Sequence, residues 1–167
     1  WGFRAYPGWQ ALELHAHAGI EGQIAALSDD IAYNNHDIDD GLRSGILKIE
    51  QLMDLPLVGD VFRRCRARYP DISENILIHE AVREMIGLMV ADVLDETRRR
   101  LKDSGADSPE AVRRLDRPMV SFSDGMTESL AAVRRFLYAN MYLHYKVKRM
   151  KEKGKMVVRD LFAAFLS

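Results

Sequence analysis

One stretch near the start of the chain, Gly19–Gly45, has a periodicity that fits a long helix with two unlike faces. The opposite sides of this helix differ in charge, because six acids occur along it before its first basic residue, Arg43. The apolar side has the spacing of a helix that lies on a core. Its members are Ile20, Ile24, Leu27, Ile31, Ile38 and Leu42. Close pairs of like charges on a helix repel by roughly 0.2–0.5 kcal/mol, so a cation or a hydrogen-bonding ligand would explain the acidic side.

The remaining periodic segments also favour helices, and the whole pattern predicts an all-α fold built as a helical bundle. Three of the predicted helices are long, at 19–45, 73–104 and 124–148. Short helices are predicted at 48–53, 58–68, 108–115 and 157–166, with a further short one at 8–14. We expect residues 1–18 to be an irregular lead-in and residues 19–167 to be a single helical domain.

Composition excludes several classes of protein. The net charge of −1 gives no overall attraction to nucleic acid, and no apolar run is long enough to cross a bilayer, so no membrane partner is expected. The single cysteine, Cys65, fits a reducing compartment, so we expect a cytoplasmic protein. The chain begins with Trp1 and not with methionine, so we expect a fragment or a processed chain.

Three polar side chains on the acidic side of the first helix are candidates for chemistry. Asp29, Tyr33 and Asp37 follow one another at four-residue spacing and therefore share a face. Asp29 is a candidate ligand for a hard divalent cation, and Tyr33 and Asp37 are candidates for hydrogen bonds to a polar ligand. The alternative is a solvated acidic face without a ligand.

A second charged segment lies near the end of the chain, where a basic run, 146–155, follows Tyr138, Tyr142 and Tyr145. Such a run is usually a solvated face. It is also compatible with binding of polyphosphate or single-stranded nucleic acid, with the tyrosines as stacking surfaces. The near-zero net charge favours the first interpretation.

The segment Ser28–Leu42, SDDIAYNNHDIDDGL, resembles the ADDIAYNxHDxxDGL motif of the deoxyguanosinetriphosphate triphosphohydrolase-like proteins of the HD-domain superfamily. The later segments IHEAVREMIGLMVADVLDETRRRL and YLHYKVKRM also resemble the C-terminal half of these enzymes. The resemblance implies that the fold is the C-terminal portion of an HD-domain-like protein.

The resemblance also implies roles for particular residues. Asp29 corresponds to the downstream metal ligand of the family, which completes a site for a divalent ion, Mg or Mn, with an upstream His and His-Asp doublet. Tyr33 and Asp37 correspond to the pair that contacts the deoxyribose, with Asp37 near the 3′-hydroxyl. Arg134 and Tyr138 resemble later nucleotide contacts of the family.

For the intact protein the resemblance implies hydrolysis of a deoxynucleoside triphosphate, such as dGTP, to the deoxynucleoside and tripolyphosphate. The only His-Asp doublet here, His36-Asp37, lies inside the downstream motif, so the upstream ligands are absent and we expect the isolated chain to be inactive. The alternative is a helical scaffold or oligomerisation module without catalysis. Exposed apolar surface around 46–61 would favour a homo-oligomer.

Overall fold

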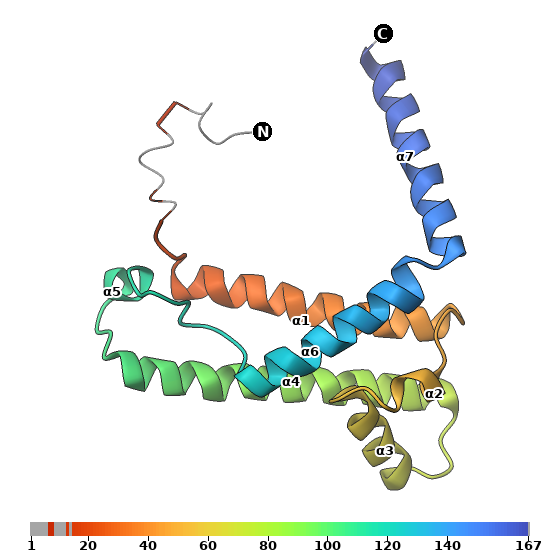
Figure 1. Ribbon diagram of the computed structural model, residues 1–167, viewed down its shortest axis with the longest axis horizontal. Coiled ribbons are helices and arrows are strands. Elements are labelled where there is room, and N and C mark those ends of the chain that lie inside the picture. The colour runs from red at the N-terminus through yellow and green to blue at the C-terminus, as the bar shows by residue number, and fades with distance from the viewer. Residues whose placement is uncertain (1–6, 9–12, 14, 167) are drawn as a thin grey trace. The chain divides into compact units, whose positions relative to one another are not determined.

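The computed structural model describes residues 7–8, 13 and 15–166, and it divides the chain into two compact units. The first unit contains the residues up to Ala32 together with Leu88–Ser123. The second contains Tyr33–Gly87 and the residues from Asp124 onwards. Two long helices, α1 (Ile20–Arg43) and α4 (Glu74–Ser104), contribute to both units (Figure 1).

Every regular element of the described residues is helical, which confirms the predicted all-α fold. The remaining elements are α2 (Ile49–Leu52), α3 (Val58–Arg68), α5 (Pro109–Arg113), α6 (Asp124–Leu137), the π-helical turn η3 (Tyr138–Tyr142) and α7 (Tyr145–Leu166). None of the helices in the described part of the chain has the length and apolar character that a bilayer span requires. Most residues of the short helix predicted at 8–14 lie outside the described ones, and the single domain at 19–167 stays a prediction.

The third long helix is not the one that the sequence pattern predicts. The sequence pattern predicts one helix at 124–148, followed by a short helix at 157–166. In the structure α6 passes into η3, helical geometry is interrupted at Leu143 and His144, and α7 then runs without a break to Leu166. Most residues of 146–156 have high helix propensity, with Val147 and Gly154 as the exceptions, and an ion pair between Lys155 and Glu152 at 2.7 Å supports the same stretch.

The core of the second unit forms where α1, α3, α4 and α6 pack together. Phe62 of α3 is fully buried at its centre. Other buried members are Ile38 and Leu42 from α1, Leu77, Ala81 and Met85 from α4, and Val133 and Leu137 from α6. Gly59 lets α3 begin close to the preceding turn, because a Cβ at this position would lie 2.0 Å from the carbonyl oxygen of Met53.

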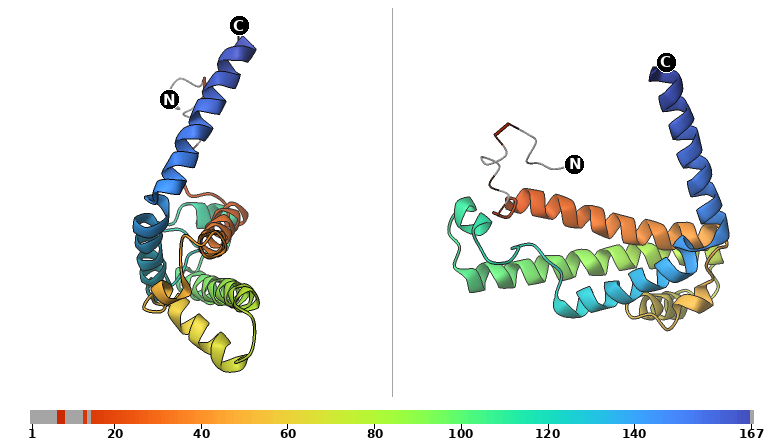
Figure 2. Two further views of the ribbon diagram at one scale, coloured as in Figure 1. Left: turned by 90° about the vertical axis from the view of Figure 1, so that its right-hand side faces the viewer. Right: turned by 45° about the horizontal axis from the view of Figure 1, so that its top comes forward.

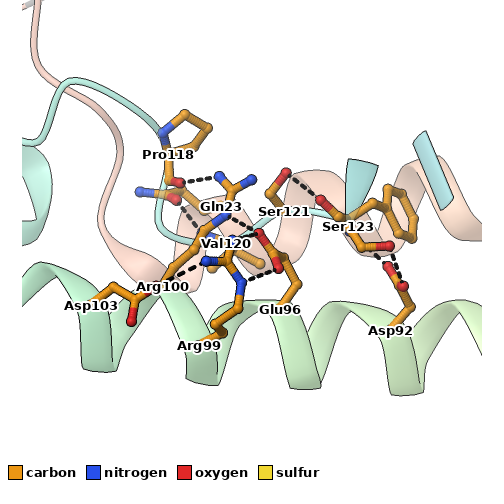
Figure 3. A network of polar contacts seen from close by, with 11 residues as sticks. Gln23, Asp92, Glu96, Arg99, Arg100, Asp103, Pro118, Val120, Ser121 and Ser123 are labelled. Carbon is orange, nitrogen blue, oxygen red and sulfur yellow. Dashed lines mark hydrogen bonds and ion pairs between the residues drawn. The ribbon is translucent and has the colours of Figure 1, made fainter. Parts of the chain in front are cut away.

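Polar contacts hold the connector between α5 and α6 against α4 and α1 in the first unit (Figure 3). Arg100 donates hydrogen bonds to Glu96 at 2.7 Å and to the carbonyl oxygen of Pro118 at 2.9 Å. The Gln23 side-chain oxygen accepts from the backbone N–H of Val120 at 2.9 Å. These contacts hold the connector in one conformation, although it has no regular secondary structure of its own.

Glu96 is buried, and the arginine that it binds, Arg100, holds the connector in place. Arg99 and Arg100 both donate to its carboxylate, and these bonds lower the pKa of Glu96 to about 2 despite its burial. A second carboxylate of α4, Asp92, accepts from the backbone N–H and the hydroxyl of Ser123 at 2.9 and 2.6 Å. The charge-assisted bonds therefore stabilise the first unit only while Glu96 is ionised.

We expect the stability contributed by Glu96 to be lost as the pH falls from about 4.5 towards about 2, because its pKa is lower in the folded state than in the unfolded state. Glu96→Gln should cost about 2–3 kcal/mol at neutral pH and flatten this part of the pH profile. Urea unfolding followed by circular dichroism at a series of pH values measures both effects.

The matched control is Asp95→Asn, which removes an exposed carboxylate of the same helix whose ion pair with Arg98 spans 3.4 Å. An exposed pair of this kind contributes at most about 0.5–1 kcal/mol. Equal losses for Glu96→Gln and Asp95→Asn would contradict the role assigned to Glu96.

Candidate functional site

A cluster of polar and aromatic side chains lies in the second unit, where α1, α6 and η3 meet. Its position follows from the core, because Ile38 and Leu42 hold this part of α1 against the buried face of α6. Tyr33 and Asp37 come from the same part of α1 but lie outside the core, with Tyr33 59% exposed and Asp37 half-buried. The predicted sugar-contacting pair is therefore accessible to a ligand.

Tyr142, in the π-helical turn, joins Tyr33 and Asp37. Its hydroxyl donates a hydrogen bond to Oδ2 of Asp37 and lies 3.4 Å from the hydroxyl of Tyr33. The turn is defined by a hydrogen bond from the backbone N–H of Leu143 to the carbonyl oxygen of Tyr138 at 3.2 Å, five residues earlier. Such turns often occur at functional sites, and this one brings the phenol of Tyr142 to the Asp37 carboxylate.

Burial raises the pKa of Asp37 above its ordinary value, and the nearby charge of Asp40 raises it further. The charge of His36 acts in the opposite direction. Because partial burial strengthens hydrogen bonds to a carboxylate, Asp37 is the strongest acceptor that the cluster presents to a ligand.

The two remaining predicted contacts lie on α6 and in the π-helical turn. Nε of Arg134 donates to the side-chain oxygen of buried Asn34 at 3.1 Å, which holds the exposed guanidinium beside α1. Tyr138 is exposed, and its ring meets the ring of Tyr142 edge to face, with centroids 6.4 Å apart. All four predicted residues of the second unit thus lie in or next to the cluster.

The sequence pattern predicts no role for Tyr142 at this site and indicates it only as a stacking surface beside the basic run. A regular helix through 124–148 would place Tyr138 and Tyr142 about 40° apart, without favouring either as the neighbour of Asp37. The π-helical turn changes that spacing, and Tyr142 is the residue that reaches Asp37.

Asp29, the predicted metal ligand, belongs to the part of α1 in the first unit. Its carboxylate is exposed, and no hydrogen bond or ion pair joins it to another described residue. No group of three or more His, Cys, Asp or Glu side chains that could hold a metal ion occurs in the part of the chain that the structure describes. A divalent cation needs several convergent oxygen ligands, so these residues alone do not fit one.

The arrangement in the second unit suits recognition of a polyhydroxylated ligand. Asp37 accepts hydrogen bonds from hydroxyl groups, and the phenols of Tyr33 and Tyr142 both donate and accept. The aromatic rings add flat apolar surface, and Arg134 adds positive charge at one side. A sugar with a charged substituent combines the features that such a cluster recognises.

Comparison with known proteins agrees with the resemblance in the α1 motif. Residues 120–167 match the family described as phosphohydrolase-associated domain, a match that includes α6, the π-helical turn and α7. Over 95% of its length the chain is 55% identical to a deoxyguanosinetriphosphate triphosphohydrolase-like protein of Parvibaculum lavamentivorans. Proteins of the same name from Azorhizobium caulinodans and Caulobacter vibrioides are 45% and 43% identical over 98% and 96% of the chain.

The similarity to the deoxyguanosinetriphosphate triphosphohydrolase-like proteins extends over almost the whole chain, and the match to the phosphohydrolase-associated domain covers its C-terminal part. These comparisons confirm the resemblance that the motif in α1 predicted. The chain spans only 40–43% of the length of the three relatives named above.

We expect Tyr142→Phe to raise the pKa of Asp37 further, because the carboxylate loses a hydrogen bond that favours its ionised form. Carbon-detected NMR titration of the Asp37 carboxyl group measures the change. Tyr138→Phe is the matched control, since it removes a phenol hydroxyl from the same turn and leaves the Tyr142 hydrogen bond in place. An unchanged titration in Tyr142→Phe would contradict the contact.

Proposed function

We propose that the chain is the sugar-binding part of a metal-dependent dNTP triphosphohydrolase, in which Tyr33, Asp37 and Tyr142 hold the deoxyribose. The observation that carries this proposal is the hydrogen bond from the Tyr142 hydroxyl to the half-buried Asp37 carboxylate, with the Tyr33 hydroxyl 3.4 Å from that of Tyr142. Asp37 accepts a hydrogen bond from the 3′-hydroxyl, and the tyrosine rings lie against the sugar. The substrate is a deoxynucleoside triphosphate such as dGTP, and the products are the deoxynucleoside and tripolyphosphate.

Arg134 and Tyr138 extend the proposed site beyond the sugar. Arg134, oriented by Asn34, offsets negative charge on the phosphates. Tyr138 supports the ring of Tyr142 and offers a further aromatic surface to the nucleoside. Holding the sugar at several points restricts the motion of the substrate relative to the reacting phosphate, which is a contribution to catalysis from residues that do not touch the reacting atoms.

The metal ion is proposed from family membership and from the exposed carboxylate of Asp29. Asp29 contributes one ligand to a Mg²⁺ or Mn²⁺ site, and the other ligands lie in the part of the family's length that this chain does not span. A single carboxylate binds such an ion weakly, so the 167-residue chain has no hydrolase activity by itself.

The proposed location is the cytoplasm, where deoxynucleoside triphosphates are used. The only cysteine, Cys65, is buried and free, so the fold needs no oxidising compartment. Hydrogen bonding to Glu84 adds to the effect of burial in raising the pKa of this thiol, which disfavours the reactive thiolate.

In a longer family protein that contains this segment, Asp29→Ala is expected to lower dGTP hydrolysis by at least about 100-fold, because a metal ligand is removed. Chromatographic assay of deoxyguanosine and tripolyphosphate measures activity, calorimetry measures metal binding, and circular dichroism reports folding. Glu21→Ala, which removes an exposed carboxylate from the first turn of α1, is the matched control and should retain activity.

Two results would contradict the proposal. Unchanged hydrolysis in Asp29→Ala would favour the alternative, a helical scaffold or oligomerisation module without catalysis. Turnover of dGTP by the 167-residue chain alone would show that it does not depend on ligands from outside this segment.

A further inference from the structure

A glycine whose backbone conformation does not require glycine lies one turn after Asp37 in α1. Gly41 is buried, and its φ is not positive, so any residue could adopt its conformation. Glycine in the interior of a helix is less stable than alanine, because it loses more conformational freedom on folding. The feature of Gly41 that needs an explanation is therefore the space that its missing side chain leaves.

Two side chains from other parts of the second unit fill this space. An ideal Cβ at Gly41 would lie 2.5 Å from Cδ1 and 2.9 Å from Cγ of Leu47, and 3.3 Å from Sδ of Met141. Leu47 is 2% exposed, and its backbone N–H donates to the carbonyl oxygen of Gly41 at 2.8 Å. Because Leu47 is held in place on both counts, a methyl group at position 41 would force Leu47 or Met141 to move.

Met141 connects this packing to the candidate site. It belongs to the π-helical turn and directly precedes Tyr142, whose hydroxyl donates to Asp37. Met141 and Tyr142 are both partly buried against the core of the second unit. Both views of Figure 2 show the blue turn between α6 and α7 beside the end of α1. How closely the turn approaches α1 therefore depends on the contact between Met141 and Gly41.

We propose that Gly41 is a positioning residue of the candidate sugar site, because its missing side chain lets the π-helical turn approach α1 closely enough for Tyr142 to bond to Asp37. A side chain at position 41 would push the turn outward through Met141, and the carboxylate would lose its phenol partner. The consequence for a bound deoxyribose rests on the proposed function, whereas the contact between Tyr142 and Asp37 does not.

The test is a double-mutant cycle in which carbon-detected NMR follows the titration of the Asp37 carboxyl group. In the wild-type chain Tyr142→Phe should shift this titration, because it removes the hydrogen bond to Asp37. In a Gly41→Ala background the same substitution should cause less than about half of that shift, because the two sites are coupled. Gly41→Ala should also weaken binding of 2′-deoxyguanosine by at least about fivefold.

Gly87→Ala is the matched control. Gly87 also lies inside a helix, α4, and nothing packed against it lies within 4 Å of a Cβ at that position. The substitution should leave unchanged both the shift caused by Tyr142→Phe and the affinity for 2′-deoxyguanosine.

A second substitution at Met141 provides a rescue. Gly41→Ala combined with Met141→Ala removes the side chain of the turn that the new methyl group would meet. The pair should recover the shift caused by Tyr142→Phe, measured against Met141→Ala alone. Circular dichroism verifies the fold of every variant, and the rescue pair decides the question if Gly41→Ala alone does not fold.

Four results would overturn the inference: no shift on Tyr142→Phe in the wild-type chain, a shift of full size in Gly41→Ala, an equal reduction of the shift in Gly87→Ala, or a folded rescue variant that lacks it. Equal affinity of the wild-type chain and Tyr142→Phe for 2′-deoxyguanosine would instead contradict the proposed function, while the cycle at Asp37 still decides the role of Gly41.

Discussion

The hydrogen bond from the Tyr142 hydroxyl to the Asp37 carboxylate is the contact on which the functional account depends. It exists because the buried residues of α1 and α6 bring the π-helical turn against the second half of α1. The same packing half-buries Asp37 and raises its pKa. A carboxylate on the acidic side of a helix thereby differs from its solvated neighbours and becomes an oriented acceptor.

Much of the fold could be predicted from the sequence because periodicity reports which side of a helix is buried. The bounds predicted for α1, α3 and α4 differ from the observed ones by two residues at most. The pattern failed between 124 and 166, because a π-helical turn inserts a local change of spacing that propensity does not encode. Tyr33 and Asp37 could be selected from a motif on one continuous helix, whereas Tyr142 depends on a contact between residues 105 positions apart.

Charged residues have two distinct roles in this molecule. In the first unit Glu96 is buried and paired with two arginines, and its low pKa keeps it ionised. These ion pairs therefore stabilise the connector at neutral pH. Asp37 in the second unit has no ion pair to a basic residue among the described contacts and has a raised pKa. Paired, strongly ionised carboxylates stabilise folds, whereas a half-buried acceptor without a cation is suited to a ligand hydroxyl.

The central claim is that Asp37 and the two tyrosines recognise a deoxyribose through its 3′-hydroxyl. NMR titration of the chain with 2′-deoxyguanosine and with 2′,3′-dideoxyguanosine tests it most directly. The account predicts shifts at Tyr33, Asp37 and Tyr142, and affinity at least about tenfold lower for the ligand without the 3′-hydroxyl, because a hydrogen bond to a charged group is lost. Equal affinity for the two nucleosides, or shifts confined to other residues, would contradict it.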